Sequence, residues 1–202
     1  MIQSLKPENN KQQPLIDYLH YKSLTQERVI VSLLGSNGTS GTGASKTSNS
    51  WAGRLEKSLR ANRNDLETLS FINHGHEGYS TEDLIKGKKI EAVIQDDPDL
   101  IIFENSLINN HYQSLSLEQT EKDLESIMTK LQKELPNAKT LILSPNPVAN
   151  GKTENSLGLN YLEYIKASEQ VIKTNKWSYL NSKEEIEKKL SKKNMRLADI
   201  PD

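Results

Sequence analysis

A regular alternation of short apolar runs with longer stretches of helical periodicity constrains the fold of this chain most strongly. Apolar residues recur at helical spacing between the runs, as in Trp51, Leu55 and Leu59. This alternation predicts right-handed crossovers and helices on both faces of a parallel sheet. We therefore predict an α/β fold, a three-layer α/β/α sandwich around a five-stranded parallel sheet. We also predict the strand order 2-1-3-4-5. The five runs expected to form its strands are 29–34, 68–73, 100–103, 140–143 and 177–180.

Composition limits the class of protein. The 202 residues fit one main domain, which we place at 28–202, preceded by a polar N-terminal arm with a short helix at 1–27. The net charge of −1 gives no indication of a nucleic-acid or anionic-membrane partner. The absence of cysteine excludes disulfides and thiolate catalysis. No apolar run approaches the ~18 residues of a membrane span.

The N-terminal residues lack the apolar core of a signal peptide, so we expect a cytoplasmic protein. An extracellular location stays open if a leader was removed.

The helix starts carry recognisable capping residues. Ser50 precedes the helix of Trp51, Ser80 opens a capping-box pattern before helical residues up to about Ile94, and Ser116 precedes a long amphipathic stretch. Pro136 and the residue after it should end that stretch.

A ligand site in such a sheet lies beyond the carboxyl ends of the strands. Segment 35–45 follows the first strand and holds four of the ten glycines of the chain. Glycine permits sharp turns and close approach of a ligand to the backbone. A flexible connection is the alternative interpretation of this segment.

This glycine-rich segment resembles the first block of the SGNH (GDSL-type) hydrolases, Gly-Asp-Ser-x-Thr-x-Gly, which is followed by a helix that starts at a tryptophan. Gly35, Thr39 and Gly41 set the register, and Trp51 matches the tryptophan. The resemblance puts Ser36 at the family's aspartate and Asn37 at its nucleophilic serine. An amide is not deprotonated into a nucleophile near neutral pH, so this departure bears directly on activity.

Two later segments match the family's oxyanion-hole blocks. Segment 73–80 is similar to Asn-x-Gly-x-x-Gly-x-Thr/Ser, and by this match the backbone N–H of Gly78 serves the oxyanion hole. After the third strand, Asn109 matches the oxyanion-hole asparagine and Asn110 the aspartate beside it, with Asn105 as the second choice for the oxyanion donor. Without the resemblance, segment 73–80 is also consistent with a helix-capping turn, and the later segment with a polar loop whose asparagines cap turns.

The family's last block is Asp-x-x-His, and Asp202 lies where its aspartate belongs. By this match the general base falls beyond the last residue given, and we expect the chain to lack the family's final helix. His74, His76 and His111 follow the same strand ends and are the alternative candidates for the base, although by the match each lies on the oxyanion side and not behind the nucleophile. His74 and His76 alone are a weak indication of a metal, so neither a metal nor a cofactor is expected.

The resemblance implies Ser-His hydrolysis of carboxylic or O-acyl esters, with a small-molecule or glycan ester as the substrate. Because Asn37 holds the nucleophile position and no histidine follows Asp202 in the sequence given, we expect little or no activity from the chain as written. Ser36 is the alternative nucleophile if the turn is shifted by one residue. Two other functions stay open: a non-catalytic acyl- or glycan-binding relative, and a phosphate or nucleotide binder whose loosened P-loop would use Lys46 with Glu104.

Overall fold

Five parallel strands form one sheet in the order β2-β1-β3-β4-β5 in the computed structural model, which describes residues 2–9, 12–146, 148 and 151–195. The α/β class and the strand order are as predicted, and each strand overlaps its predicted run. The central strands β1 and β3 are almost fully buried, which explains their continuous apolar sequences. The strands span Ile30–Gly35 (β1), Ser70–Gly75 (β2), Leu100–Glu104 (β3), Lys139–Leu143 (β4) and Tyr179–Leu180 (β5).

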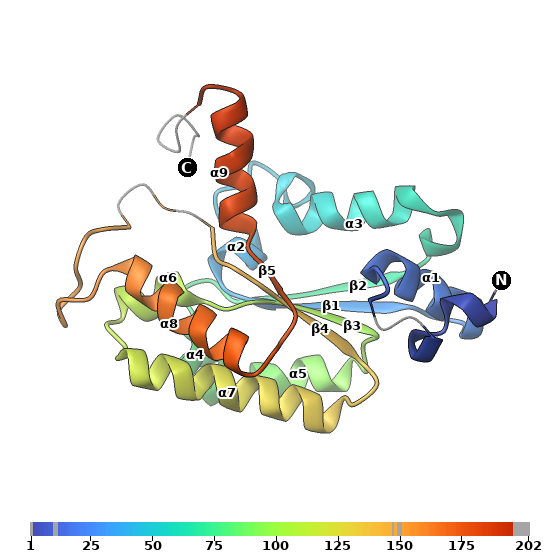
Figure 1. Cartoon of the computed structure of the whole chain (residues 1–202), viewed down its shortest axis with the longest axis horizontal. Coiled ribbons are helices and arrows are strands. Elements are labelled where there is room, and N and C mark those ends of the chain that lie inside the picture. Colours follow the sequence, from blue (N-terminus) through green and yellow to red (C-terminus); the bar gives the residue numbers. More distant parts are fainter. Residues whose placement is uncertain (1, 10–11, 147, 149–150, 196–202) are drawn as a thin grey trace.

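Helices cover both faces of the sheet and complete a three-layer sandwich (Figure 1). Helices α1 and α3 lie on one side, and α4, α5, α7 and α8 lie on the other. The α-helices are α1 (Leu15–Thr25), α2 (Asn37–Ser40), α3 (Trp51–Asn62), α4 (Thr81–Lys86), α5 (Lys89–Gln95), α6 (Leu107–Tyr112), α7 (Leu117–Glu134), α8 (Tyr161–Thr174) and α9 (Ser182–Lys192). The described residues also form four short 3-10 helices: η1 (Ile2–Leu5), η2 (Pro7–Asn9), η3 (Thr47–Asn49) and η4 (Asn64–Leu66).

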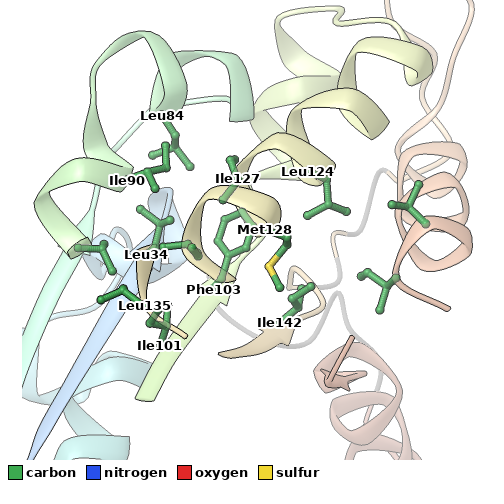
Figure 2. Close-up of a cluster of buried hydrophobic side chains, with 14 residues drawn as sticks. Leu34, Leu84, Ile90, Ile101, Phe103, Leu124, Ile127, Met128, Leu135 and Ile142 are labelled. Atoms are coloured by element: carbon green, nitrogen blue, oxygen red, sulfur yellow. The ribbon is translucent and has the colours of Figure 1, made fainter. Parts of the chain in front are cut away.

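Each face of the sheet has its own hydrophobic core. On the α7 side, Leu34, Phe103 and Ile142 of the sheet point toward side chains of the helices, including Ile127 and Met128 (Figure 2). Full burial of such a side chain stabilises the fold by about 1.5–3 kcal/mol relative to exposure. The opposite core includes Tyr18, Leu19, Val31, Leu33, Leu66 and Ile102.

Helix α1 packs into this second core. Tyr18 and Leu19 are 2% and 0% exposed, and the Tyr18 hydroxyl donates to the carbonyl of Asn137 over 3.1 Å. The end of segment 1–27 therefore contributes side chains to the packing of the main domain. The division of the chain at residues 27 and 28 stays a prediction.

The predicted helix caps are present. The side-chain oxygens of Ser50, Ser80 and Ser116 accept backbone N–H groups three residues later, over 3.1, 3.2 and 3.1 Å. Helix α7 ends at Glu134, ahead of Pro136, as predicted.

The helical residues predicted up to about Ile94 form two helices, α4 and α5. Lys88 adopts a left-handed conformation with φ 54°, which ends one helix and starts the next. Helices α2 and α6 lie in segments for which the sequence pattern predicted no helix. No helix in the described part of the chain is both long and apolar enough to span a membrane.

Candidate functional site

The first strand ends in a tight turn that places Asn37 at the start of α2. A Cβ on Gly35 would lie 2.2 Å from the Thr39 Oγ1 and 2.8 Å from the Glu104 Oε2, so only glycine fits there. The single turn of α2 ends at Gly41, which has φ 90°. These two glycines fix the path that presents residue 37 at the carboxyl end of β1.

A buried carboxylate at the end of the neighbouring strand β3 holds this turn through hydrogen bonds. Glu104, the last residue of β3, accepts the Ser36 backbone N–H over 2.8 Å and the Ser36 hydroxyl over 3.0 Å. It also accepts the Thr39 hydroxyl over 3.3 Å and the Ser106 backbone N–H over 3.0 Å. Sequence reasoning considered Glu104 only as a P-loop carboxylate and missed this contact; the available signal was an acidic residue directly after a buried strand.

Ser36 points into this carboxylate and not toward the carboxyl-end surface. Its side chain is 0% exposed. In this conformation its hydroxyl is not accessible to a substrate. Ser36 could act as the nucleophile only if the turn adopted a different backbone conformation.

Three of the residues singled out in the sequence converge on one point. The Asn37 Oδ1 accepts the backbone N–H of Gly78 over 2.6 Å and the Asn109 Nδ2 over 3.3 Å. The orientation of the Asn37 amide follows from chemistry, because both neighbours are donors and only an oxygen can accept from them. The two groups expected to stabilise an oxyanion are thus aimed at the side chain in the nucleophile position.

Contacts from neighbouring elements hold the two donors in place. The Asn109 Nδ2 also donates to the Tyr79 carbonyl over 2.9 Å, and Gln113 donates to the Gly78 carbonyl over 3.0 Å. Asn109 and Gln113 belong to α6 and the residue that caps it, so this short helix positions the donors.

Glycine at position 78 is required by backbone conformation. Its φ is 77°, and a Cβ there would meet nothing within 4 Å.

The other two asparagines serve the scaffold. Asn110 accepts the Thr81 backbone N–H over 2.8 Å and donates to the hydroxyls of Thr81 and Thr120. The Asn105 Nδ2 donates to the Ser168 hydroxyl of α8 over 2.8 Å. Both amides are buried, and their hydrogen bonds go to Thr81, Thr120 and Ser168. Asn109 is therefore the asparagine that contacts Asn37.

The histidines named in the sequence have separate surroundings. His74 contacts Asp96, with 2.6 Å between Nε2 and Oδ2, and the His111 Nε2 lies 3.0 Å from the Thr153 carbonyl. His76 packs against the Tyr79 ring, and burial, with the charges of Lys89 and His74, lowers its pKa. Among the described residues, no three His, Cys, Asp or Glu side chains are grouped to hold a metal.

The remaining predicted positions add little to the geometry. Asp202 lies outside the described residues. Lys46, the P-loop candidate, is exposed and extended at the start of η3, and its supposed partner Glu104 is engaged by Ser36 and Ser106. Trp51 lies near the turn, because a Cβ on Gly38 would be 3.7 Å from the indole nitrogen.

Solved structures of similar fold include several esterases. A Parabacteroides merdae ATCC 43184 protein assigned as a GDSL-like lipase has a TM-score of 0.64 at 14% identity, over 81% of each chain. The acetyl xylan esterase AlAXEase has a TM-score of 0.61 at 18% identity, over 82% of this chain and 83% of its own. The SGNH-hydrolase family esterase AlinE4 has a TM-score of 0.58 at 20% identity, over 77% and 76%.

A comparison of the sequence with curated proteins finds no match. The model of the GDSL-like lipase/acylhydrolase family matches residues 33–200, which include the turn after β1 and the segments after β2 and β3. The chain therefore belongs to the GDSL-like lipase/acylhydrolase family.

Proposed function

We propose that this chain has a site of the SGNH type that binds carboxylic or O-acyl esters. Asn37 in place of the nucleophile prevents this site from hydrolysing them. One observation carries the proposal: the Asn37 amide oxygen lies between the Gly78 N–H and the Asn109 amide. The donors of an oxyanion hole are thus retained beside a side chain that cannot attack a carbonyl.

The chemistry of the two halves of the site differs. Preorganised donors bind the carbonyl oxygen of an ester and stabilise it more strongly as it becomes an oxyanion. The amide of Asn37 supplies no nucleophile, and in Ser-His systems loss of the nucleophile removes most of the rate. Oxyanion stabilisation and binding alone leave a residual acceleration of ~10³–10⁴ over water.

Family membership supports ester chemistry in general and leaves the alcohol part of the substrate open. Small acyl esters and O-acetylated glycans are the compounds to test. A hydroxyl at position 37 would attack the acyl carbonyl while Gly78 and Asn109 hold the developing oxyanion.

The test is turnover of a short-chain nitrophenyl ester by the unmodified chain, Asn37→Ser and Asn37→Ala, each with and without added imidazole as an external general base. We expect the unmodified chain and Asn37→Ala to remain close together, and Asn37→Ser to gain activity that imidazole increases. Adding Asn109→Ala to Asn37→Ser should lower that activity by about 10²-fold, because one oxyanion donor is lost.

Robust turnover by the unmodified chain that Ser36→Ala abolishes would overturn the proposal and make Ser36 the nucleophile. A ligand at 100 times its Kd adds about 2.7 kcal/mol to the free energy of unfolding. A rise in melting temperature with Mg-ATP that corresponds to this gain would favour the phosphate-binding alternative.

A further inference from the structure

Asn37 is followed by glycine, and this Asn-Gly pair lies inside the candidate oxyanion hole. We propose that the hole acts on the side chain of Asn37 itself, so that the folded protein deamidates this residue to aspartate and isoaspartate. The inference depends on the geometry of the hydrogen bonds and not on any ester-hydrolysing activity.

The reaction is an acyl transfer within the chain. The backbone nitrogen of Gly38 attacks the Asn37 Cγ, and the Oδ1 becomes an oxyanion. The Cγ–Nδ2 bond then breaks, and ammonia leaves with the proton that the Gly38 nitrogen loses. Water opens the resulting five-membered imide at either carbonyl and gives aspartate or isoaspartate. The net change is addition of one water and release of one ammonia, without any oxidant or cofactor.

The donors are placed where this reaction develops charge. The Gly78 N–H lies 2.6 Å from the Asn37 Oδ1 and the Asn109 Nδ2 lies 3.3 Å from it. A donor pair in this arrangement stabilises a tetrahedral intermediate regardless of whether the acyl group belongs to a substrate or to the protein. The same contacts polarise the amide carbonyl in the ground state.

The local backbone permits the attack. Gly38 is partly exposed, and even a Cβ at this position would have only ordinary contacts, 3.5 Å from the Asn146 Nδ2 and 3.7 Å from the Trp51 Nε1. Ring closure requires Asn37 to leave its helical conformation. Helix α2 resists this change weakly, because it has four residues, one of them an interior glycine, and ends at another glycine.

Deamidation changes the charge of the site. A carboxylate at position 37 accepts the same two donors in charge-assisted hydrogen bonds, which are roughly twice as strong as neutral ones. The modified site then holds a fixed anion where a substrate carbonyl oxygen would bind, so acyl ligands should bind the deamidated protein more weakly.

Asn150 and Gly151 form the only other Asn-Gly pair in the sequence. This pair serves as an internal reference for the rate of deamidation. Trypsin separates the two sites into peptides 29–46 and 140–152. The experiment incubates the whole chain at neutral pH, folded or unfolded in urea, and follows the loss of the amide in both peptides by mass spectrometry. We expect folded Asn37 to convert at least as fast as unfolded Asn37, and to give both aspartate and isoaspartate.

Two variants separate the donors from the sequence. Asn109→Ala should slow conversion of folded Asn37 by roughly 10-fold to 100-fold, while conversion of Asn150 is unchanged. Gly38→Ala, which the space around Gly38 accommodates, should suppress conversion at Asn37 alone.

Conversion of Asn37 that is about tenfold slower in the folded than in the unfolded protein would overturn the proposal, since the fold would then protect the amide. An unchanged rate in a folded Asn109→Ala variant would also contradict it. Because the first comparison uses the unmodified chain, it remains decisive if Asn109→Ala does not fold.

Discussion

Replacing Glu104 with glutamine tests how the turn that carries Asn37 is held. The Glu104 carboxylate is 6% exposed and faces donors from Ser36, Thr39 and Ser106. Every neighbour in this set offers a hydrogen, and the carboxylate has acceptors on both oxygens. An amide keeps only one acceptor and turns an N–H₂ group toward a backbone N–H.

The expected loss follows from these contacts. If the amide oxygen keeps the Ser36 side, its NH₂ faces the Ser106 N–H, which loses a hydrogen bond to a charged acceptor worth about 1.5–3 kcal/mol. Leaving that buried N–H unsatisfied is part of the same cost, and the Ser36 and Thr39 hydroxyls can rotate to recover some of it. We therefore expect Glu104→Gln to lower the free energy of unfolding by about 2–4 kcal/mol.

The assay is urea and thermal unfolding of the unmodified chain and Glu104→Gln. For a chain of this size the loss corresponds to a fall in Tm of roughly 5–15 °C. Glu125→Gln on the exposed face of α7 is the matched control, and we expect it to stay within about 0.5 kcal/mol of the parent. A Glu104→Gln variant that also stays within about 0.5 kcal/mol would refute the view that the carboxylate holds the turn.

Three further outcomes test the scaffold. Leu34→Ala, at a fully buried position, should cost about 2–5 kcal/mol in urea unfolding, and a loss under about 1 kcal/mol would contradict the packing described for that core. Ser80→Ala should cost about 1 kcal/mol, because it removes the cap of α4; no change in the urea midpoint would speak against the capping box. Burial tends to raise the pKa of Asp83, but hydrogen bonds from Gln113 and Ser80 outweigh it and hold that pKa below its usual value. Because the folded pKa is the lower one, Asp83 stabilises the fold above its unfolded pKa, and this contribution disappears as the pH falls through the folded pKa. Urea midpoints of the parent and Asp83→Asn should therefore converge on acidification, and a constant gap would refute this linkage.

Much of the fold could be predicted because its signals are local in the sequence. The apolar runs of β1 and β3 report burial on both faces of a parallel strand, and Ser50 and Ser80 mark helix starts through their own hydrogen bonds. Gly78 and Asn109 could be predicted to lie at the same edge of the sheet, because each follows a strand and parallel strands end at the same edge.

The parts that were not predicted depend on contacts between distant segments. Helices α2 and α6 have four and six residues, too short to be stable by propensity, and form because the surrounding structure holds them. The role of Glu104 becomes visible only when β3 lies beside β1, since its partner Ser36 is 68 positions away. The break at Lys88 is a left-handed residue in an otherwise helical pattern, for which lysine gives no sequence signal.

The most direct test of the central claim is the NMR signal of the Gly78 backbone amide in the unmodified chain and in Asn37→Ala. The claim is that the residue 37 side chain lies between the two oxyanion donors, with a Gly78 hydrogen bond of 2.6 Å. We expect the Gly78 amide proton to resonate downfield and to move upfield, with faster solvent exchange, when Asn37 becomes alanine. The Asn109 side-chain NH₂ should respond as well, because it loses its hydrogen bond to the Asn37 Oδ1 and keeps only the one to the Tyr79 carbonyl. A Gly78 amide signal that is identical in the two proteins would contradict the claim.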